Sequence, residues 1–330
     1  MISVPGRQPA GLIRIESWAL SRLLPGRGSG GRPGGALSPA EPSVRRTSLA
    51  GGPPWPGGAV CPVALPGPVA LPCGTMSPMD LGLRDRAYVI TGGSRGLGLA
   101  TARALVADGA RVVLSARDAA GVAAAAAGLG TGQVAGRAAD LADPATPQQL
   151  VAAARDTFGR LDGALISVGG PPGGTVMGTS DESWRAAFES VFLGAVRLAR
   201  TLGGELGEGG SIAFVLSSSV RSPIDSLAIS NGLRPGLAGV AKSLADELGP
   251  RGIRVNGLLP GRIATGRVRE LDARRGDPDE VRTALSERIP LRRYGAPEEF
   301  GRVAAFVLSS AASYLTGAMI PVDGGALRSL

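Results

Sequence analysis

Short apolar runs alternate with amphipathic stretches over most of the chain after residue 86. The runs "AYVIT", "RVVLSA", "LDGALIS", "SIAFVLS" and "IRVNGLLP" are rich in Val, Ile and Leu. Helical stretches such as "GLATARALVADG" and "PQQLVAAARDTFG" lie between them. Continuous apolar strands that alternate with helices are typical of a parallel sheet covered on both faces. The pattern therefore predicts an α/β fold with three layers, α/β/α, around a doubly wound parallel sheet.

Two longer segments carry a helical period. In residues 181–202, apolar side chains recur at spacings of three and four, which predicts a helix with one buried stripe. The stripe consists of Trp184, Phe188, Val191, Ala195, Leu198 and Leu202. A second amphipathic helix is predicted in residues 228–248, where Pro235 cannot donate a backbone hydrogen bond. We expect this helix to begin near Arg234, with Ser230 on the segment that leads into it.

Residues 1–78 have a different composition and hold 14 of the 26 prolines. They show neither a helical nor a strand period, so we expect a disordered segment. Prolines interrupt every apolar run that a secretory signal would need. We interpret the segment as sequence upstream of the true start, at Met76 or Met79, and expect one folded domain over residues 79–330.

Composition excludes several classes of site. The chain of 330 residues contains no histidine, and Cys61 and Cys73 are too few for a disulfide framework or a zinc site, so no metal site is predicted. The net charge of +8 comes from arginines that are scattered among acids, which does not favour a nucleic-acid partner. No stretch of eighteen or more residues is apolar enough to span a membrane.

A glycine-rich loop follows the first predicted strand. In "TGGSRGLGLA", Gly92, Gly96 and Gly98 stand where the chain must turn tightly and let a pyrophosphate approach the amides of a helix. The loop joins a strand to a helix within an alternating α/β series, which is the context that a dinucleotide-binding loop requires.

The spacing Thr-Gly-x-x-x-Gly-x-Gly resembles the short-chain dehydrogenase/reductase family, whose fold is of the Rossmann type. Later segments resemble family landmarks in the same order: "AADLAD", "IRVNGLLPGRIAT", "PLRRYGAPEEF" and "SYLTGAMIPVDGG". The resemblance extends from about Leu81 to the C-terminus and implies a single-domain oxidoreductase. It also implies a cytoplasmic homodimer or homotetramer that pairs its long helices, and a small-molecule substrate.

The predicted cofactor is NADP(H). An NAD site usually has a carboxylate at the end of the second strand, whereas here Arg117 follows the strand and Arg95 lies in the glycine loop. Two guanidinium groups suit a 2′-phosphate, although Asp118 stands next to Arg117 and Arg117 could be a plain surface residue. The cofactor residues implied by the loop and the family landmarks are Thr91, Gly92, Ser94, Arg95, Gly96, Leu97, Gly98, Arg117, Asp140, Leu141, Gly169, Arg234, Pro260, Gly261, Ile263 and Thr265.

The resemblance places unusual residues in the active site. The family uses Asn, Ser, Tyr and Lys, and here the Tyr position falls on Ser230, the Lys position on Arg234 and the Asn position on Phe192. A serine remains at Ser218 or Ser219, and Ser219 is preferred because Val220 follows it. The predicted catalytic residues are therefore Ser219, Ser218, Ser230 and Arg234.

Serine cannot simply replace tyrosine as an acid. A phenol has a pKa of about 10, and an alcohol lies near the value of water, about 15.7. The difference corresponds to about 8 kcal/mol, more than one neighbouring arginine is expected to recover. Arginine stays protonated, so it can stabilise an oxyanion but cannot readily give up a proton.

Two functions follow from these residues. The first is an NADP-dependent oxidoreductase acting on a carbonyl or alcohol, in which Arg221 and Arg262 border the cleft and bind an anionic group of the substrate. Those two arginines could instead form salt bridges with Asp225 or other nearby acids. The second function is an NADP-binding protein without turnover, such as a sensor or an inactive partner subunit.

Overall fold

The structure of the protein is a computed structural model that describes residues 80–130 and 132–329. All of them belong to a compact unit, Leu71–Leu330. The predictions made for residues 1–78, including the start at Met76 or Met79, lie outside the described residues.

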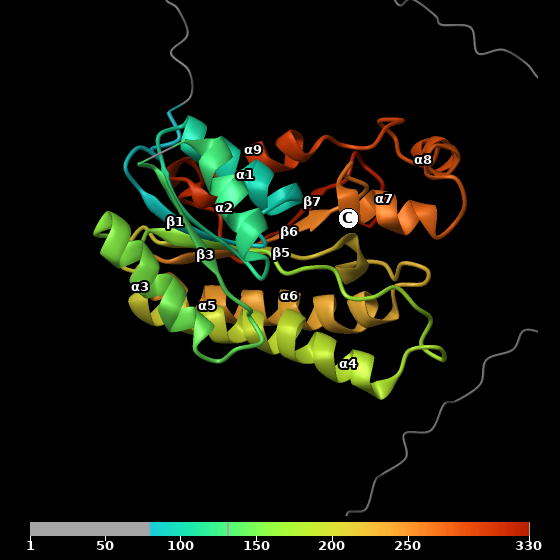
Figure 1. Cartoon of the computed structure of the whole chain (residues 1–330), viewed down its shortest axis with the longest axis horizontal. Coiled ribbons are helices and arrows are strands. Elements are labelled where there is room, and N and C mark those ends of the chain that lie inside the picture. Colours follow the sequence, from blue (N-terminus) through green and yellow to red (C-terminus); the bar gives the residue numbers. More distant parts are fainter. Residues whose placement is uncertain (1–79, 131, 330) are drawn as a thin grey trace, which may run out of the picture. The chain divides into compact units, whose positions relative to one another are not determined.

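Seven parallel strands form one sheet in the order β3-β2-β1-β4-β5-β6-β7, which confirms the predicted doubly wound arrangement (Figure 1). Each strand is short and rich in apolar residues; β1, β4 and β5 are buried throughout, whereas the edge strands β3 and β7 are more exposed. The strands are β1 (Ala87–Thr91), β2 (Arg111–Ala116), β3 (Val134–Ala138), β4 (Gly163–Ile166), β5 (Ser211–Val215), β6 (Arg254–Pro260) and β7 (Met319–Val322).

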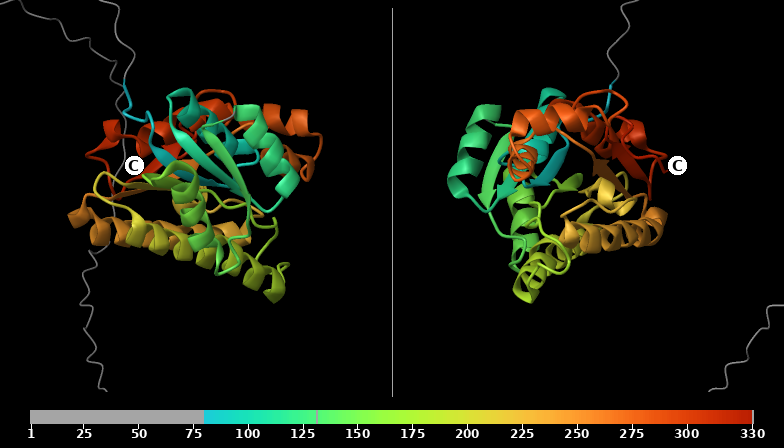
Figure 2. Two further views of the ribbon diagram at one scale, coloured as in Figure 1. Left: turned by 60° about the vertical axis from the view of Figure 1, so that its left-hand side comes forward. Right: turned by 90° about the vertical axis from the view of Figure 1, so that its right-hand side faces the viewer.

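Helices cover both faces of the sheet, and the two views of Figure 2 separate the layers clearly. One layer consists of α1 (Gly96–Ala107), α2 (Ala119–Leu129) and α9 (Pro297–Leu308). The other consists of α3 (Thr146–Phe158), α5 (Gly194–Glu205) and α6 (Ala228–Leu248). Helix α4 (Asp181–Ala187) runs into α5 through a π-helical turn, Phe188–Leu193, while α7 (Gly266–Ala273) and α8 (Pro278–Ser286) lie beyond the end of the sheet.

Each layer has its own apolar core. Phe214 and Leu198 belong to the cluster under α3, α5 and α6, and Tyr88 and Phe300 belong to the cluster under α1 and α9. The stripe predicted along residues 181–202 is buried from Val191 onward, but Phe188 is 42% exposed. The π-helical turn explains the difference, because it changes the helical phase between α4 and α5.

Helix α6 begins earlier than its sequence predicts. It runs from Ala228 and contains Pro235 in its second turn, so Ser230 is on the helix and not on a lead-in segment. The side chain of Asn231 secures the first turn, accepting from the amide of Ile224 at 3.0 Å and donating to its carbonyl at 2.9 Å. This anchor compensates for the single backbone hydrogen bond that Pro235 cannot make.

The winding of the chain reverses between β1 and β4, which are neighbours in the sheet. In parallel sheets, ligands bind outside the carboxyl ends of the strands at such a reversal. The carboxyl ends of β1, β2, β4, β5 and β6 all open toward the same edge, so the fold brings residues from five separate segments together there.

The segment before α9 is fixed by an acidic residue whose contribution depends on pH. Glu299 accepts from the amide of Ala296 at 2.7 Å and from Arg293 through two contacts of 2.7 Å. The Arg293 guanidinium is the main reason that the pKa of Glu299 falls from 4.5 to about 2. A carboxylate with a lowered pKa stabilises the fold above its unfolded pKa and loses this effect as pH falls through its folded value.

We therefore expect Glu299→Gln to lower the melting temperature at pH 6 and to have little effect near pH 2. Thermal unfolding followed by circular dichroism from pH 6 to pH 2 measures the difference from the wild type. The neighbouring exposed Glu298→Gln is the control and should show no comparable trend. A constant deficit for Glu299→Gln across this range would contradict the expectation.

Candidate functional site

A large cleft of about 1770 Å³ lies at the carboxyl ends of the strands. The glycine loop and α1 form one side, and the loop after β4 and the start of α6 form another. Residues of α7 close the far end. Every residue that the sequence predicts for the cofactor lines this cleft.

The glycine loop is shaped so that the backbone can approach a ligand closely. Gly92 has a φ of 59°, and a Cβ there would lie 2.7 Å from the carbonyl oxygen of Ser167. A Cβ on Gly98 would lie 2.4 Å from the carbonyl oxygen of Gly92, so α1 can pack against the loop only through glycine. No side chain caps the N-terminus of α1. Its first amides therefore offer a cradle for a phosphate group.

The end of β2 presents a cation to the same side of the cleft. Arg117 and Arg95 both line the cleft, and neither forms an ion pair within the described residues. Asp118 is occupied differently, because its side chain caps α2 by accepting from the amide of Ala120 at 3.1 Å. Asp118 is thus the N-cap of α2 and stabilises the start of that helix.

Two buried hydroxyl groups meet where the segment after β5 packs against α6, next to residues that line the cleft. Ser219 is 3% exposed and Ser230 is 7% exposed, and their Oγ atoms are 3.2 Å apart. The hydroxyl of Ser217 holds the Ser219 segment by accepting from the Ser219 amide at 3.0 Å. Ser218 lines the cleft directly, whereas Ser219 lies just beneath it against α6. The structure thus brings together two of the residues predicted for catalysis from different elements.

Arg234 lies one helical turn after Ser230 on α6 and lines the cleft. Its guanidinium donates to the carbonyl oxygens of Val215, at 2.8 Å, and Val168, at 3.4 Å. Burial lowers the pKa of Arg234 to about 10, and the side chain remains charged at neutral pH. The result is a fixed positive charge at the ends of β5 and β4.

Aromatic side chains fill the space between α6 and the long helix that precedes it. A Cβ on Gly236 would lie 2.9 Å from the Phe192 ring, and a Cβ on Gly232 would lie 2.9 Å from the Trp184 ring. Phe192 also stacks on Phe188 with ring centroids 5.3 Å apart. Phe192 is therefore accommodated by glycines on α6, and its ring offers no hydrogen-bonding group.

The two arginines predicted to bind substrate occupy different surroundings. Arg262 lines the cleft, and its Nη1 atom is 2.6 Å from the carboxylate of the buried Asp272 on α7. Tyr294 donates to the same carboxylate at 3.1 Å. Arg262 therefore fixes α7 to the turn after β6. Arg221 is not among the described residues that line the cleft, and it donates to the carbonyl of Met319 in β7 at 3.4 Å.

Other arginines reach the cleft without having been predicted. Arg267, Arg274 and Arg275 of the α7 region all line it. They lie in the segment between Ile263 and Pro290, whose sequence contains no family landmark. The spacing of Arg267, Leu271 and Arg274 was an available signal, since it places all three on one face of a helix.

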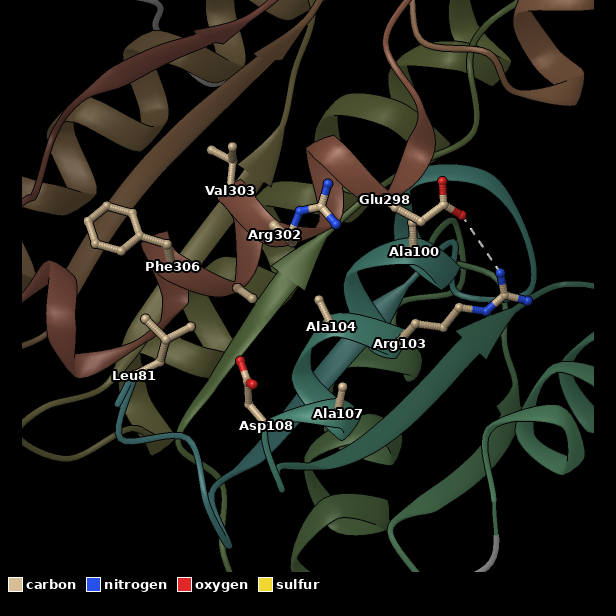
Figure 3. Close-up of a pocket in the computed structure, with 11 residues that line it drawn as sticks. Leu81, Ala100, Arg103, Ala104, Ala107, Asp108, Glu298, Arg302, Val303 and Phe306 are labelled. Carbon is tan, nitrogen blue, oxygen red and sulfur yellow. Dashed lines mark ion pairs between the residues drawn. The ribbon is translucent and has the colours of Figure 1, made fainter. Parts of the chain in front are cut away.

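A second cavity of about 710 Å³ lies between α1 and α9 (Figure 3). Its lining is mostly apolar, and Arg103 approaches Glu298 at 4.0 Å across its rim. None of the predicted site residues lines it. This second cavity is therefore not a candidate for the predicted cofactor or catalytic site.

Neither a membrane span nor a metal centre is found among residues 80–130 and 132–329. No helix there is long and apolar enough to cross a bilayer. The same residues contain no cluster of His, Cys, Asp and Glu side chains that could hold a metal ion.

Comparison with known proteins identifies relatives over nearly all of the described residues. Residues 92–326 match the family model described as enoyl-(acyl carrier protein) reductase. An oxidoreductase of Mycobacterium tuberculosis is 36% identical over 251 residues, which cover 74% of this chain and 92% of that protein. Levodione reductase of Leifsonia aquatica is 34% identical over 256 residues, covering 73% of this chain and 94% of the reductase.

Solved structures agree with these relatives. L-sorbose reductase of Gluconobacter frateurii, crystallised with NADPH and L-sorbose, is 33% identical with a TM-score of 0.71, covering 76% of this chain and 100% of the reductase. A short-chain oxidoreductase of Pseudomonas aeruginosa, described as containing an atypical catalytic centre, is 29% identical with a TM-score of 0.70. It is matched over 75% of this chain and 99% of its own.

The contact between Arg262 and Asp272 can be tested through stability. Asp272→Asn keeps the shape of the side chain but leaves the partly buried Arg262 without its carboxylate. We expect the free energy of unfolding to fall by about 1–3 kcal/mol, measured by urea denaturation. The exposed Asp246→Asn on α6 is the control and should change stability by less than about 0.5 kcal/mol. Equal stability of the two variants would show that the ion pair does not hold α7.

Proposed function

Because this chain belongs to the short-chain dehydrogenase/reductase family, we propose that it is an NADP(H)-dependent oxidoreductase that interconverts a carbonyl compound and an alcohol. The observation that carries this proposal is the pair of buried hydroxyls, Ser219 and Ser230, which lie 3.2 Å apart on segments whose residues Ser218 and Arg234 line the cleft. Buried polar groups positioned next to a fixed positive charge are suited to stabilising charge on a reacting oxygen.

Several features favour NADP(H) over NAD(H). Arg95 and Arg117 stand on the side of the cleft where the second strand ends, and a guanidinium can grip a phosphate through two hydrogen bonds. Asp118, the carboxylate that could have held a ribose 2′-hydroxyl, caps α2 instead. The L-sorbose reductase crystallised with NADPH supplies a precedent among similar structures.

In the proposed mechanism, the bound nicotinamide supplies or accepts the hydride. The Ser219 hydroxyl, which donates to the Ser230 carbonyl at 3.4 Å in the structure, turns to donate to the substrate oxygen, while the Ser230 hydroxyl donates to Ser219 and holds it in place. A hydroxyl in such a chain can pass on one proton while it accepts another, so neither serine has to ionise fully. The charge of Arg234 at the strand ends stabilises the developing oxyanion. Water in the cleft is the proposed proton source.

A rival proposal is an NADP-binding protein without turnover. The packing of Phe192 against Gly236 favours it, because this ring fills space beside α6 with apolar atoms. Ser230 and Arg234, where the family resemblance implies Tyr and Lys, favour it as well. The similar Pseudomonas protein, described as an oxidoreductase that contains an atypical catalytic centre, favours the first proposal instead.

The proposed enzyme is cytoplasmic and forms a homodimer or homotetramer through its long helices. The exposed ring of Phe188, on the turn between α4 and α5, supports an apolar contact at this surface. Residues 1–78 are proposed to lie upstream of the functional domain.

The two proposals differ in their expected activity. We expect NADPH oxidation with members of a panel of aldehydes and ketones, followed at 340 nm. Ser219→Ala should reduce kcat by at least about 100-fold, while Ser230→Ala should retain more activity because it acts through Ser219. Ser313→Ala, far from the cleft lining, is the control. Absence of oxidation with every carbonyl, together with normal NADPH binding, would favour the rival proposal.

Cofactor preference tests the role of Arg117. Loss of one charge-assisted contact to the 2′-phosphate should weaken NADPH binding about 10- to 150-fold in Arg117→Ala and leave NADH binding almost unchanged. Calorimetric titration measures both affinities. Arg103→Ala on α1 is the control, since Arg103 lines the other cavity. An unchanged ratio of NADPH to NADH affinity would remove Arg117 from this role.

A further inference from the structure

Two arginines, Arg267 on α7 and Arg274 directly after it, approach the loop that follows β4. This loop consists of glycine and proline. The loop after β4 reads "GGPPGG" over residues 169–174. Arg267 donates to the carbonyl of Pro171 at 2.6 Å, and a Cβ on Gly170 would lie 2.9 Å from its Nε atom. The Nη1 atom of Arg274 lies 3.3 Å from the position of a Cβ on Gly173. The glycines thus leave room for guanidinium groups across the mouth of the cleft.

Not all of these charges are neutralised. Arg262 pairs with Asp272 at 2.6 Å, and Arg267 pairs with Glu270 at 3.7 Å. Arg274 and Arg275 form no ion pair with any described residue.

Two further acids line this part of the cleft. Glu182 has Arg185 as its partner at 3.7 Å, and Asp225 is exposed and without an ion pair among the described residues. Two unpaired cations therefore face one unpaired acid, and the entrance carries excess positive charge.

Arg274 lies near the part of the loop that is bonded to the start of α6. Gly174, next to the residue that Arg274 approaches, accepts from the amide of Ala228 at 3.0 Å. Ala228 is the first residue of α6, and Ser230 lies on the same turn. A group held by Arg274 would therefore lie at the end of the cleft where α6 begins.

We propose that Arg274, assisted by Arg275, binds a carboxylate or phosphate group of the substrate, so that the substrate class is an anionic carbonyl compound or alcohol. This inference rests on the proposed oxidoreductase function and adds the substrate class. Arg267 has a different role, because its hydrogen bond to the carbonyl of Pro171 holds α7 against the loop, and Glu270 of the same helix pairs with its charge. An exposed cation at the mouth of a cleft also attracts anions from solution.

Matched probes that differ in one charge test this assignment. Acetoacetate and benzoylformate are each compared with their methyl esters, using the full chain saturated with NADPH. Calorimetry measures binding, and absorbance at 340 nm measures turnover. The variants are Arg274→Met, which keeps the apolar stem, Arg274→Lys, which keeps a charge, and Arg269→Met as the control. Arg269 is exposed on α7 and is not among the described residues that line the cleft.

We expect the wild type to bind at least one acid about 10-fold more tightly than its ester. Arg274→Met should bring this ratio close to one, Arg274→Lys should keep part of it, and Arg269→Met should leave it unchanged. Adding 0.5 M NaCl should weaken binding of the acid but not of the ester, because salt screens an exposed charge.

The outcomes separate this inference from the proposed function. Turnover of neutral carbonyls without preference for an acid would overturn the anion site and leave the oxidoreductase intact. Binding of an acid that depends on Arg274, without turnover of any probe, would support the site and count against the oxidoreductase. An acid preference that survives in Arg274→Met, or no binding of any probe, would overturn the assignment of Arg274.

Discussion

The cleft depends on a buried cation that main-chain oxygens hold in place. The Arg234 guanidinium donates to the carbonyls of Val215 and Val168 and forms no ion pair among the described residues. Burying a charge in this way is costly unless its hydrogen bonds are satisfied, and here the ends of two strands satisfy them. The contact fixes α6 against the sheet, brings Ser230 to Ser219, and leaves a positive charge at the base of the cleft.

The parts of the site that the sequence predicts well are those whose constraints are local. A strand, a glycine loop and a helix follow one another within residues 87–107, and the close approach of Gly98 to Gly92 is encoded within seven positions. The alternating apolar runs likewise predict the layers, because each strand must be covered on both faces. The sheet order and the predicted cofactor lining follow from such short-range patterns.

The features that the sequence did not predict depend on contacts between distant segments. Pro235 indicated a later start for α6, but Asn231 secures the first turn by bonding to Ile224. Arg262 could be assigned to a substrate or to an acid, and only the fold brings Asp272 within 2.6 Å of it. Arg267 and Arg274 lie against a glycine loop, residues 169–174, that is almost one hundred residues earlier in the chain.

Aromatic packing along α6 connects the buried hydroxyl pair and the buried cation with the helix that precedes α6. Trp184 on α4 and Phe192 on the π-helical turn meet Gly232 and Gly236, respectively, which are one turn apart on α6. A larger residue at either glycine would collide with a ring, and an amide in place of Phe192 would leave a gap between the helices. A change at one of these packed positions would therefore disturb its neighbours. Ser230 and Arg234 alternate with these glycines along α6, so the hydroxyl pair and the buried cation are built into the same packed helix.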